Sequence, residues 1–439
     1  MDGGSFIEGF SGLNRADKIK LAATYTGDPD SFIQILQHHW HPDQEQQKRY
    51  EEFTENVVSN YFLPYSLAPN FRINGKNYLV PMVTEESSVV AAAASAAKFW
   101  WPLGGFSTRI LEMDKAGHIH FIWKGNHRKI SDLVSEIEPG FHEVLMPVTQ
   151  KMTGRGGGIR SIRLRDCSGL LEGYYQIEVI FNTSDAMGAN FINTCLETMA
   201  DYLRHQADLR GLSDRLEIIM AILSNYTPGC TVSCSVECKV QDLSVLHPDG
   251  NGQAFARKFE TAAKIARHNI HRAVTQNKGI FNGIDAVLMA TGNDFRAAEA
   301  AGHAWASKDG TYRGLTEVEL KNDVFSCRIE IPLSVGVVGG LTRSHPMAGA
   351  SLMLLGNPDA AGLMAIAAST GLASNFSAIR ALITGGIQQG HMRMHLMNIL
   401  NQLGATESEK QQAFQFFKQE VVSYAGVSTF IDMLRKEKS

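Results

Sequence analysis

N277-K-G-I-F-N-G-I-D-A-V-L-M-A-T-G-N-D294 is the stretch around which the rest of the chain can be organised. From Ile280 to Leu288 its apolar residues recur at i, i+4, i+7 and i+8, a spacing typical of a buried helix. A lysine and an aspartate stand near its ends, close to glycines, which let a backbone turn or approach a ligand. Taken alone, Lys278 would be a solvated residue at a helix start, and Asp294 would cap the next helix.

The composition is that of an ordinary globular protein, with 439 residues of which 44% are hydrophobic and 20% charged. This length exceeds one hydrophobic core, so we expect two or three folding units. The formal net charge of −4 gives no global field that favours nucleic acid or an anionic membrane. The first ten residues lack the basic and apolar regions of a secretory signal, and glycine and polar residues interrupt the apolar stretch 360–373. We therefore expect a soluble, cytoplasmic protein.

Three of the six cysteines, Cys230, Cys234 and Cys238, alternate with valines in the pattern of a strand with one buried face. Residues four apart on a strand lie roughly 13 Å from each other. One zinc ion cannot bridge them, because a Zn–S bond is about 2.3 Å long. We expect these thiols to pack as small apolar groups. The cluster His38–His41 is explained by a polar loop that ends at a proline, so no metal is expected.

The order of helical and strand patterns suggests a smaller α+β domain inserted into a larger helical one. Helical patterns open the chain, and a hairpin with its turn at Asn74-Gly75 and an alanine-rich helix follow. Long helices are expected at 252–276, 295–306 and 360–387, and a polar helical tail begins near Gly390. The expected strands of the inserted part are 110–113, 118–123, 159–164 and 175–181, and its expected helices are 130–145 and 190–209.

Four further stretches place polar residues where local structure does not require them. T84-E-E-S-S88 precedes the alanine-rich helix, whose dipole stabilises carboxylates. D185-A-M-G-A-N190 lies between a strand and a helix, where free N–H groups suit a pyrophosphate, although the Rossmann G-x-G-x-x-G is absent. The other two are H268-N-I-H-R272 and the segment from N375 to H395. Plain helix caps and exposed helix histidines remain the local alternatives.

In this order along the chain, these stretches resemble one family, the soluble class II 3-hydroxy-3-methylglutaryl-coenzyme A (HMG-CoA) reductases. The resemblance runs from about Asn56 to His395, and its motifs are specific together although each is weak alone. They are E55-N-V-V-S-N-Y-F-L-P-Y65, V80-P-M-V-T-E-E-S-S-V-V-A-A-A93, D185-A-M-G-A-N190, N277 to D294, and G371-L-A-S-N-F376 through G386-I-Q-Q-G-H391.

The resemblance implies an oxidoreductase that reduces HMG-CoA to mevalonate and free coenzyme A in two hydride transfers. Lys278 matches the cation that stabilises negative charge on the carbonyl oxygen, and Asp294 matches the aspartate that orients this lysine. Glu86 matches the acid that protonates the nascent hydroxyl, a role that requires a raised pKa. His391 matches the proton donor to the coenzyme A thiolate, on a terminal segment that suits a closing flap.

The binding residues come from the same motif match. Those matched to the substrate are Ser88, Arg272, Asn282 and Asn375, and those matched to the cofactor are Asp185, Met187, Gly188, Asn190 and Asn225. Among them the arginine can hold a carboxylate bidentately, and Asn282 would bridge substrate and nicotinamide. Gly386 replaces what is often a glutamate, and Ser11 stands where a basic residue near coenzyme A is common. These departures leave the coenzyme A contacts open.

The implied fold is α+β, with a mostly helical large domain, an inserted small ferredoxin-like (non-Rossmann) dinucleotide-binding domain and a C-terminal helical flap. The expected boundaries are 1–108 and 223–385 for the large domain, 109–222 for the small domain and 386–439 for the flap. The resemblance also implies a homodimer or higher oligomer with active sites at the subunit interface, and no nucleic-acid or membrane partner.

The reverse oxidation of mevalonate to HMG-CoA with NAD is the alternative direction. Another nicotinamide or acyl-coenzyme A enzyme, or a binding protein on the same scaffold, is the alternative function.

The expected cofactor is NADPH, with NADH as the alternative. In family members specific for NADH, an aspartate before the glycine-rich turn binds the adenosine ribose. Counting back from G156-G-G158 places that position near Thr149, where no acid occurs. A carboxylate there would repel the 2′-phosphate of NADPH. The basic residues nearby are Lys151, Arg155, Arg160, Arg163 and Arg165, for which a solvated strand face is the alternative.

Overall fold

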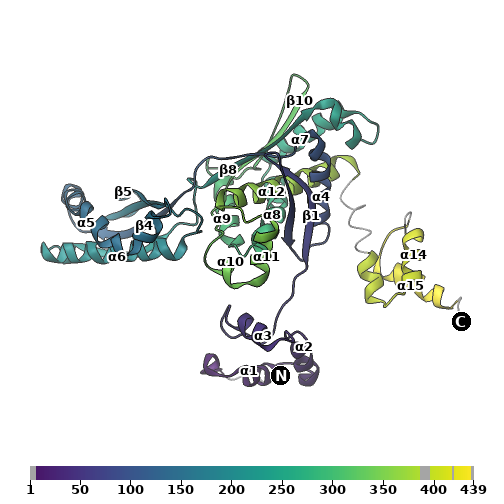
Figure 1. The fold of residues 1–439 in the computed structure, drawn as a ribbon, viewed down its shortest axis with the longest axis horizontal. Helices are drawn as coiled ribbons and strands as arrows, with labels where there is room; N and C mark the ends of the chain where they lie inside the picture. The colour runs from purple at the N-terminus through teal and green to yellow at the C-terminus, as the bar shows by residue number, and fades with distance from the viewer. Residues whose placement is uncertain (1–5, 386–395, 418–419, 437–439) are drawn as a thin grey trace. The chain divides into compact units, whose positions relative to one another are not determined.

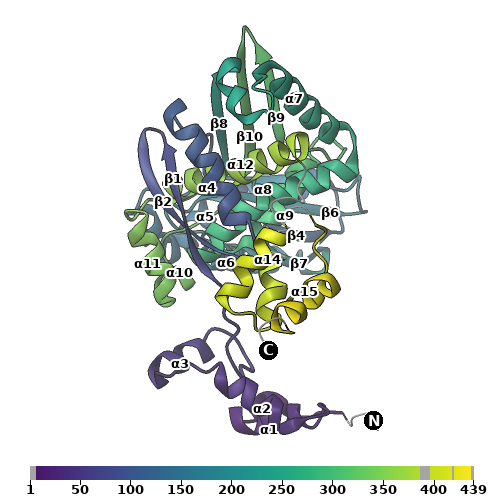
Figure 2. The ribbon, with the colours of Figure 1, turned by 90° about the vertical axis from the view of Figure 1, so that its right-hand side faces the viewer.

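The computed structural model describes residues 6–385, 396–417 and 420–436. It divides into two compact units, Met1–Pro64 and Tyr65–Ser439. Figure 1 and Figure 2 show the ribbon from two directions.

The first unit consists of short helices: η1 (Phe10–Gly12), α1 (Arg15–Ala23), α2 (Pro29–His38) and α3 (Gln44–Glu51). The side chains of Asn14, Asp28 and Asp43 cap the three α-helices by accepting a backbone N–H three residues on. Such caps fix where a helix begins. They agree with the helical patterns predicted for this part of the chain.

The second unit begins with the predicted hairpin, β1 (Tyr65–Ile73) and β2 (Lys76–Val83). Asn74 and Gly75 both have positive φ angles, 47° and 82°, as a tight two-residue hairpin turn requires. The alanine-rich helix α4 (Val89–Trp100) and η2 (Trp101–Leu103) follow.

A four-stranded antiparallel sheet has the order β3-β8-β10-β9, from β3 (Ser107–Ile110), β8 (Thr231–Lys239), β9 (Thr316–Lys321) and β10 (Val324–Pro332). Cys230, Cys234, Cys238 and Cys327 are buried and unpaired, so the predicted packing of thiols on one face is confirmed. Burial raises the pKa of Cys234 and Cys238 to about 12. These thiols are structural and unreactive.

Helices α7 (Gly252–His268), α9 (Phe295–Ala306) and α12 (Ala360–Thr384), with η4 (Val240–Leu246), pack against this sheet. Helices α8 (Ile270–Ala290) and α11 (Pro346–Leu354) contact β2 of the hairpin, and the short α10 (Leu341–Ser344) contacts α11. Both views show α8 and α12 side by side. Their backbones approach closely at Gly283 and Gly371, because a Cβ atom on Gly283 would lie 2.4 Å from the carbonyl oxygen of Thr370. This close approach brings polar side chains of both helices to one place.

The helical stretch predicted from Gly252 to Gln276 is divided at Asn269, which the sequence analysis did not foresee. Asn269 has an extended backbone, and its side chain accepts from the N–H of Arg272 to cap α8. Lys278 therefore lies in the third turn of α8 and not at a helix start. Asp294 caps α9, as its local pattern indicated.

Helix α12 is, in the described residues, the one helix long and apolar enough to cross a membrane by length and composition alone. In its most hydrophobic window 89% of the residues are buried inside the fold. Helix α12 therefore has the burial of a core helix.

A second four-stranded sheet has its own core. Its elements are β4 (Asp114–Trp123), α5 (His127–Thr153), β5 (Gly158–Asp166), β6 (Tyr174–Asn182), α6 (Ala189–Leu209), η3 (Ser213–Arg215) and β7 (Leu216–Leu223). The strand order is β5-β6-β4-β7, and every neighbouring pair is antiparallel. Strand β7 was not among the predicted strands, because its nearly continuous apolar run hides the alternation by which strands are recognised.

The C-terminal segment contains α14 (Glu407–Phe416) and α15 (Tyr424–Lys436) around a small apolar cluster of its own. Thr406 and Glu409 form a capping box, and Glu409 also accepts from Arg435. This helical tail was predicted. His391 lies outside the described residues.

Candidate active site

The first half of α8, the start of α4 and the C-terminal half of α12 line a cavity of about 550 Å³, called here the Lys278 cavity. Six of the residues selected from the sequence line it: Glu86, Ser88, Arg272, Lys278, Asn282 and Asn375. They come from α8, from α12 and from the segment just before α4, which are far apart in the chain. Their meeting is a property of the fold, because no local pattern requires it.

Lys278 and Glu86 form an ion pair in this cavity, with 2.5 Å between Nζ and Oε2. Their side chains are 57% and 39% exposed, so both groups remain open to a ligand. The backbone N–H of Glu86 donates to the Thr84 hydroxyl, which fixes the approach of the glutamate. The pair offers a cation for a developing oxyanion and a carboxyl group that can carry a proton.

Ser88 precedes α4 with a φ angle of 71°, a left-handed conformation that is uncommon outside glycine. Its hydroxyl donates to the carbonyl of Ser87 and does not cap the helix. The first N–H groups of α4 are therefore left without a side-chain cap beside the cavity. Backbone strain of this kind is concentrated at ligand-binding sites.

The charged groups that line the Lys278 cavity are Arg272, Lys278 and Arg380 against Glu86 alone. Arg272 makes no ion pair in the part of the chain that the structure describes. Arg380 donates to the hydroxyl of Ser95, and burial lowers the pKa of its guanidinium. The excess of positive charge suits an anionic ligand.

The polar residues of this cavity that were not predicted from the sequence are Ser95, Thr275, Gln276, Ser374, Ser377 and Arg380. Gln276 and Ser374 are 2% and 4% exposed, and the side-chain amide of the first and the hydroxyl of the second lack a hydrogen-bond partner. Buried polar groups are normally paired, so these two are available to a ligand. Ser374 directly precedes Asn375 in the motif L-A-S-N-F, which was the available signal.

Asn375 is 1% exposed and holds α12 to its neighbours. Its amide donates to the carbonyl of Gln276 over 2.9 Å, and its oxygen accepts from the Thr316 hydroxyl over 2.7 Å. One amide N–H is left for a ligand. Asn375 thus has a packing role that the sequence did not indicate, besides its place in the cavity wall.

Asp294 does not lie in the Lys278 cavity. Its carboxylate accepts from the backbone N–H groups of Arg296 and Ala297 and pairs with the Arg296 side chain at 3.2 Å. From Lys278 to Ala290, the end of α8, the helix rises about 18 Å. The two predicted catalytic residues are therefore separated within one chain.

Four of the five predicted cofactor residues lie in the turn Thr183–Gly188 or at the start of α6, and Asn225 follows β7. Gly188 has a φ of 90°, and a Cβ atom there would lie 2.4 Å from the Thr183 side chain, so only glycine fits. No side chain caps α6, and the exposed Asn190 lies in its first turn. Uncapped N–H groups at a helix start suit a phosphate.

Asp185, within this turn, and Asn225, beside it, have different contacts. A carboxylate oxygen of Asp185 accepts from the N–H of Ala360 over 2.9 Å and ties the turn to α12. Asn225 instead lines a crevice beside Met187. Asp185 therefore positions the turn, while Asn225 is open to a ligand.

The glycine-rich loop after α5 lies against the same turn, since the Ser184 hydroxyl donates to the carbonyl of Arg155 over 3.3 Å. Arg165 is committed to Glu178 at 2.7 Å, and Arg160 lies 3.9 Å from Asp114. Lys151 and Arg155 form no ion pair within the described ranges. The end of α5 and the loop after it therefore carry uncommitted positive charge near the turn.

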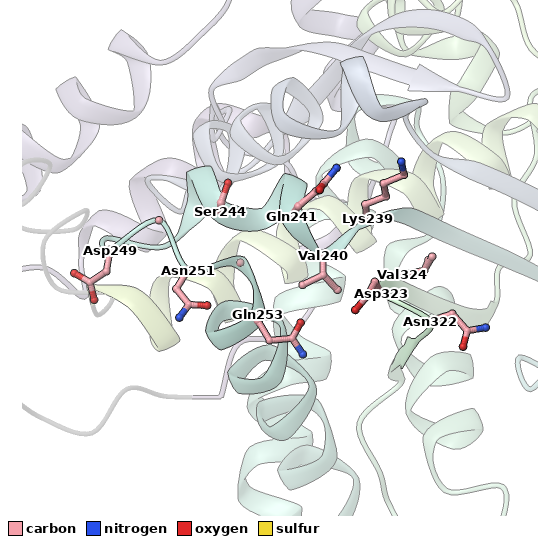
Figure 3. A pocket seen from close by; sticks show the side chains of 12 residues that line it. Lys239, Val240, Gln241, Ser244, Asp249, Asn251, Gln253, Asn322, Asp323 and Val324 are labelled. Carbon is pink, nitrogen blue, oxygen red and sulfur yellow. The ribbon is translucent and has the colours of Figure 1, made fainter.

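Two further hollows extend from the Lys278 cavity. The Lys98 hollow, about 550 Å³, shares Ser95 and Arg380 with the cavity. The Lys239 hollow, about 870 Å³, shares Gln241 and Ser244 with the Lys98 hollow and contains none of the predicted site residues (Figure 3). No group of three or more His, Cys, Asp or Glu side chains is placed to hold a metal ion among the residues described.

Comparison with known proteins gives consistent matches. The family model described as hydroxymethylglutaryl-coenzyme A reductase matches residues 30–396. A 3-hydroxy-3-methylglutaryl-coenzyme A reductase of Archaeoglobus fulgidus is 34% identical over 407 residues, which are 92% of this chain and 89% of that protein.

Solved structures of the class II enzyme from Streptococcus pneumoniae are also similar. One, bound to NADPH in open conformations, has a TM-score of 0.71 at 33% identity and covers 86% of this chain and 99% of its own. Another has a TM-score of 0.72 at 32% identity and covers 97% of this chain and 99% of its own.

Proposed function

Because the chain belongs to the hydroxymethylglutaryl-coenzyme A reductase family, we propose that it reduces the thioester of HMG-CoA to the primary alcohol of mevalonate and releases coenzyme A. The observation that carries this function is the Lys278–Glu86 pair in a cavity with excess positive charge. The family and the matching class II structures support the same activity.

The first hydride adds to the thioester carbonyl carbon and leaves an oxyanion, which the Lys278 ammonium stabilises. The resulting hemithioacetal collapses to an aldehyde and a thiolate, and we propose that His391 protonates the thiolate. A second hydride then adds to the aldehyde, and Glu86 supplies the proton of the new hydroxyl. The balance is two hydrides and two protons for each thioester.

The carboxylate of the hydroxymethylglutaryl group would bind Arg272, which has no competing carboxylate in the described chain. The unpaired hydroxyl of Ser374 and the Gln276 amide would take its tertiary hydroxyl and carboxylate oxygens. Ser88, Asn282 and Asn375 complete the proposed substrate residues.

We propose that coenzyme A leaves the Lys278 cavity along α4, between Ser95 and Arg380, into the Lys98 hollow. Arg380 and Lys98 offer positive charge for its phosphates. Arg380→Met should raise KM for HMG-CoA about tenfold, since a charge-assisted hydrogen bond is lost. The KM for free mevaldehyde, which carries no coenzyme A, should stay unchanged, and an equal rise for both would place the coenzyme elsewhere.

We propose that the unit from 109 to 222 is a ferredoxin-like dinucleotide-binding domain. The β-α-β-β-α-β order and the strand order β5-β6-β4-β7 support this assignment. The dinucleotide would bind at the turn of Asp185, Met187, Gly188 and Asn190, with Asn225 beside it. Lys151 and Arg155 favour NADPH over NADH. A kcat/KM that is higher with NADH would refute this preference.

The large domain would then comprise 1–108 and 223–385, and the flap 386–439. A homodimer with active sites at the interface would explain the separation of Lys278 from Asp294. Asn293 accepts from the N–H of Gly336, and a Cβ on Gly336 would lie 2.4 Å from the backbone N of Met187. The turn Thr183–Gly188, called here the cofactor turn, thus lies near the Asp294 end of α8. A second copy would bring its own Asp294 and its own bound cofactor to Lys278. We propose that the enzyme is cytoplasmic and has no membrane or nucleic-acid partner.

The deciding experiment follows absorbance at 340 nm with purified protein, HMG-CoA and each reduced cofactor. Two molecules of NADPH consumed per mevalonate formed is the expected result. Activity only in the direction of mevalonate oxidation with NAD and coenzyme A would select the alternative, degradative direction. Absence of turnover in both directions would refute the function.

A further inference from the structure

Strand β4 carries a lysine where its pattern requires an apolar residue. Burial alternates along the strand, and Lys115 lies on the same face as the fully buried Ile119 and Phe121. Lys115 is only 3% exposed. A buried ammonium group costs free energy unless it is paired, so its position calls for an explanation.

The Lys115 ammonium lies directly under the cofactor turn. Its Nζ donates to the hydroxyl of Thr183 over 2.5 Å and to the carbonyl oxygen of Ala186 over 3.0 Å. Both acceptors are neutral, and no carboxylate lies within ion-pair distance in the described parts of the chain. Of its three N–H donors, two are used and one is left.

A crevice opens beside this lysine and is called here the Lys115 crevice. Its lining includes Lys115, Met187, Ala189 and Asn225, so it adjoins the uncapped start of α6. Its free volume is about 10 Å³, which is room for about one polar atom the size of a water molecule.

Thr227 provides an independent observation at the same crevice. The residue is 3% exposed, lines the crevice, and its hydroxyl has no hydrogen-bond partner. An unpaired buried hydroxyl is uncommon, because each one costs the free energy of its lost hydration. The crevice therefore has two buried donors that face a space of atomic size.

We propose that Lys115 and Thr227 bind the pyrophosphate of the nicotinamide dinucleotide, one of whose unesterified oxygens enters the Lys115 crevice. This inference rests on the proposed function in that it takes a dinucleotide as the cofactor. The α6 N–H groups hold the pyrophosphate from one side. Burial lowers the pKa of the Lys115 ammonium, and an anion in the crevice would favour its charged form. The attraction between the two is strong because the site is shielded from water.

The test compares the binding of NADPH, 2′-AMP and inorganic pyrophosphate to the full chain by calorimetry. The ligand 2′-AMP keeps the adenosine and the 2′-phosphate but has no pyrophosphate. Lys115→Met should weaken the binding of NADPH and of pyrophosphate by about 10- to 100-fold each. The affinity for 2′-AMP should change less than about twofold. Thr227→Val, which keeps the side-chain volume, should weaken NADPH by about 3- to 10-fold. Lys124→Met removes an exposed lysine just beyond β4 and should change nothing.

The proposal would be overturned if Lys115→Met and Thr227→Val both bound NADPH within about twofold of the wild-type affinity. In that case water, and not a pyrophosphate oxygen, would occupy the crevice. Equal losses for NADPH and 2′-AMP would also overturn it, because they would show damage to the turn. If Lys115→Met does not fold, Thr227→Val decides alone. A wild-type chain that binds pyrophosphate through Lys115 but no dinucleotide would refute the proposed function and keep the anion site.

Discussion

In the function proposed above, both reduction steps depend on the ammonium group of Lys278. Lys278→Met removes the cation beside the oxyanion, so kcat/KM should fall by at least about 10²–10³ for HMG-CoA and for free mevaldehyde alike. The measurement is NADPH oxidation with each substrate. Lys258→Met, at an exposed position of α7, is the control. Near-normal reduction of mevaldehyde by Lys278→Met would show that the lysine has another role.

Asp285 lies one turn beyond Asn282 on α8, and one of its carboxylate oxygens is buried without a partner. Burial and the carboxylate of Glu299 raise its pKa to about 8. The folded protein therefore keeps this proton between about pH 4 and 8 while the unfolded chain loses it. Over this range the group makes stability fall as pH rises.

Asp285→Asn keeps the neutral form at every pH. Its free energy of unfolding should therefore rise relative to that of the wild type from pH 5 to 8, by at most about 1.4 kcal/mol per pH unit. Urea titrations at several pH values measure this difference. The exposed Asp309→Asn should run parallel to the wild type, and a parallel course for Asp285→Asn as well would contradict the raised pKa.

At the scale of elements, the contact between α8 and α12 depends on Gly283. An added Cβ atom would lie 2.4 Å from the Thr370 carbonyl oxygen, so Gly283→Ala must push the two helices apart. We expect a loss of about 1–3 kcal/mol in the free energy of unfolding, measured by urea denaturation.

Gly279→Ala is the matched control, one turn away on the same helix. Its Cβ would meet only the Asn375 amide nitrogen, at an ordinary 3.5 Å. Alanine has the better helix propensity by about 1 kcal/mol, so this variant should be neutral or more stable. If both variants lost stability equally, the close approach at Gly283 would not explain the stability of the contact between α8 and α12.

Elements with local signals were predictable from the sequence, and those set by distant contacts were not. The hairpin at Asn74-Gly75 and the start of α6 follow from turn chemistry and periodicity. The division at Asn269 is settled by one capping side chain within a continuous helical pattern. Arg380 lines the cavity because of how α12 packs against α4, and no spacing in the chain reveals that packing.

At the scale of the whole molecule, the distance between Lys278 and Asp294 gives a test of assembly. Lys278→Ala and Asp294→Ala should each be inactive. If each site takes its lysine and its aspartate from different copies, half of the dimers in an equal, re-equilibrated mixture are mixed, and each has one intact site. About a quarter of the wild-type activity should then return. A mixture that stays inactive would place the whole site within one chain.

Because most of the thiols are buried, their chemical labelling can report the unfolding of this protein. Cys195, Cys230, Cys234, Cys238 and Cys327 are buried, and Cys167 alone is partly exposed. A maleimide dye should therefore label the native protein once, in the loop between β5 and β6, without any substitution. The mass of the labelled chain would then count the exposed thiols. One added label would indicate opening around Cys195 on α6, and four would indicate opening of the sheet β3-β8-β10-β9, which contains or adjoins the other four buried thiols.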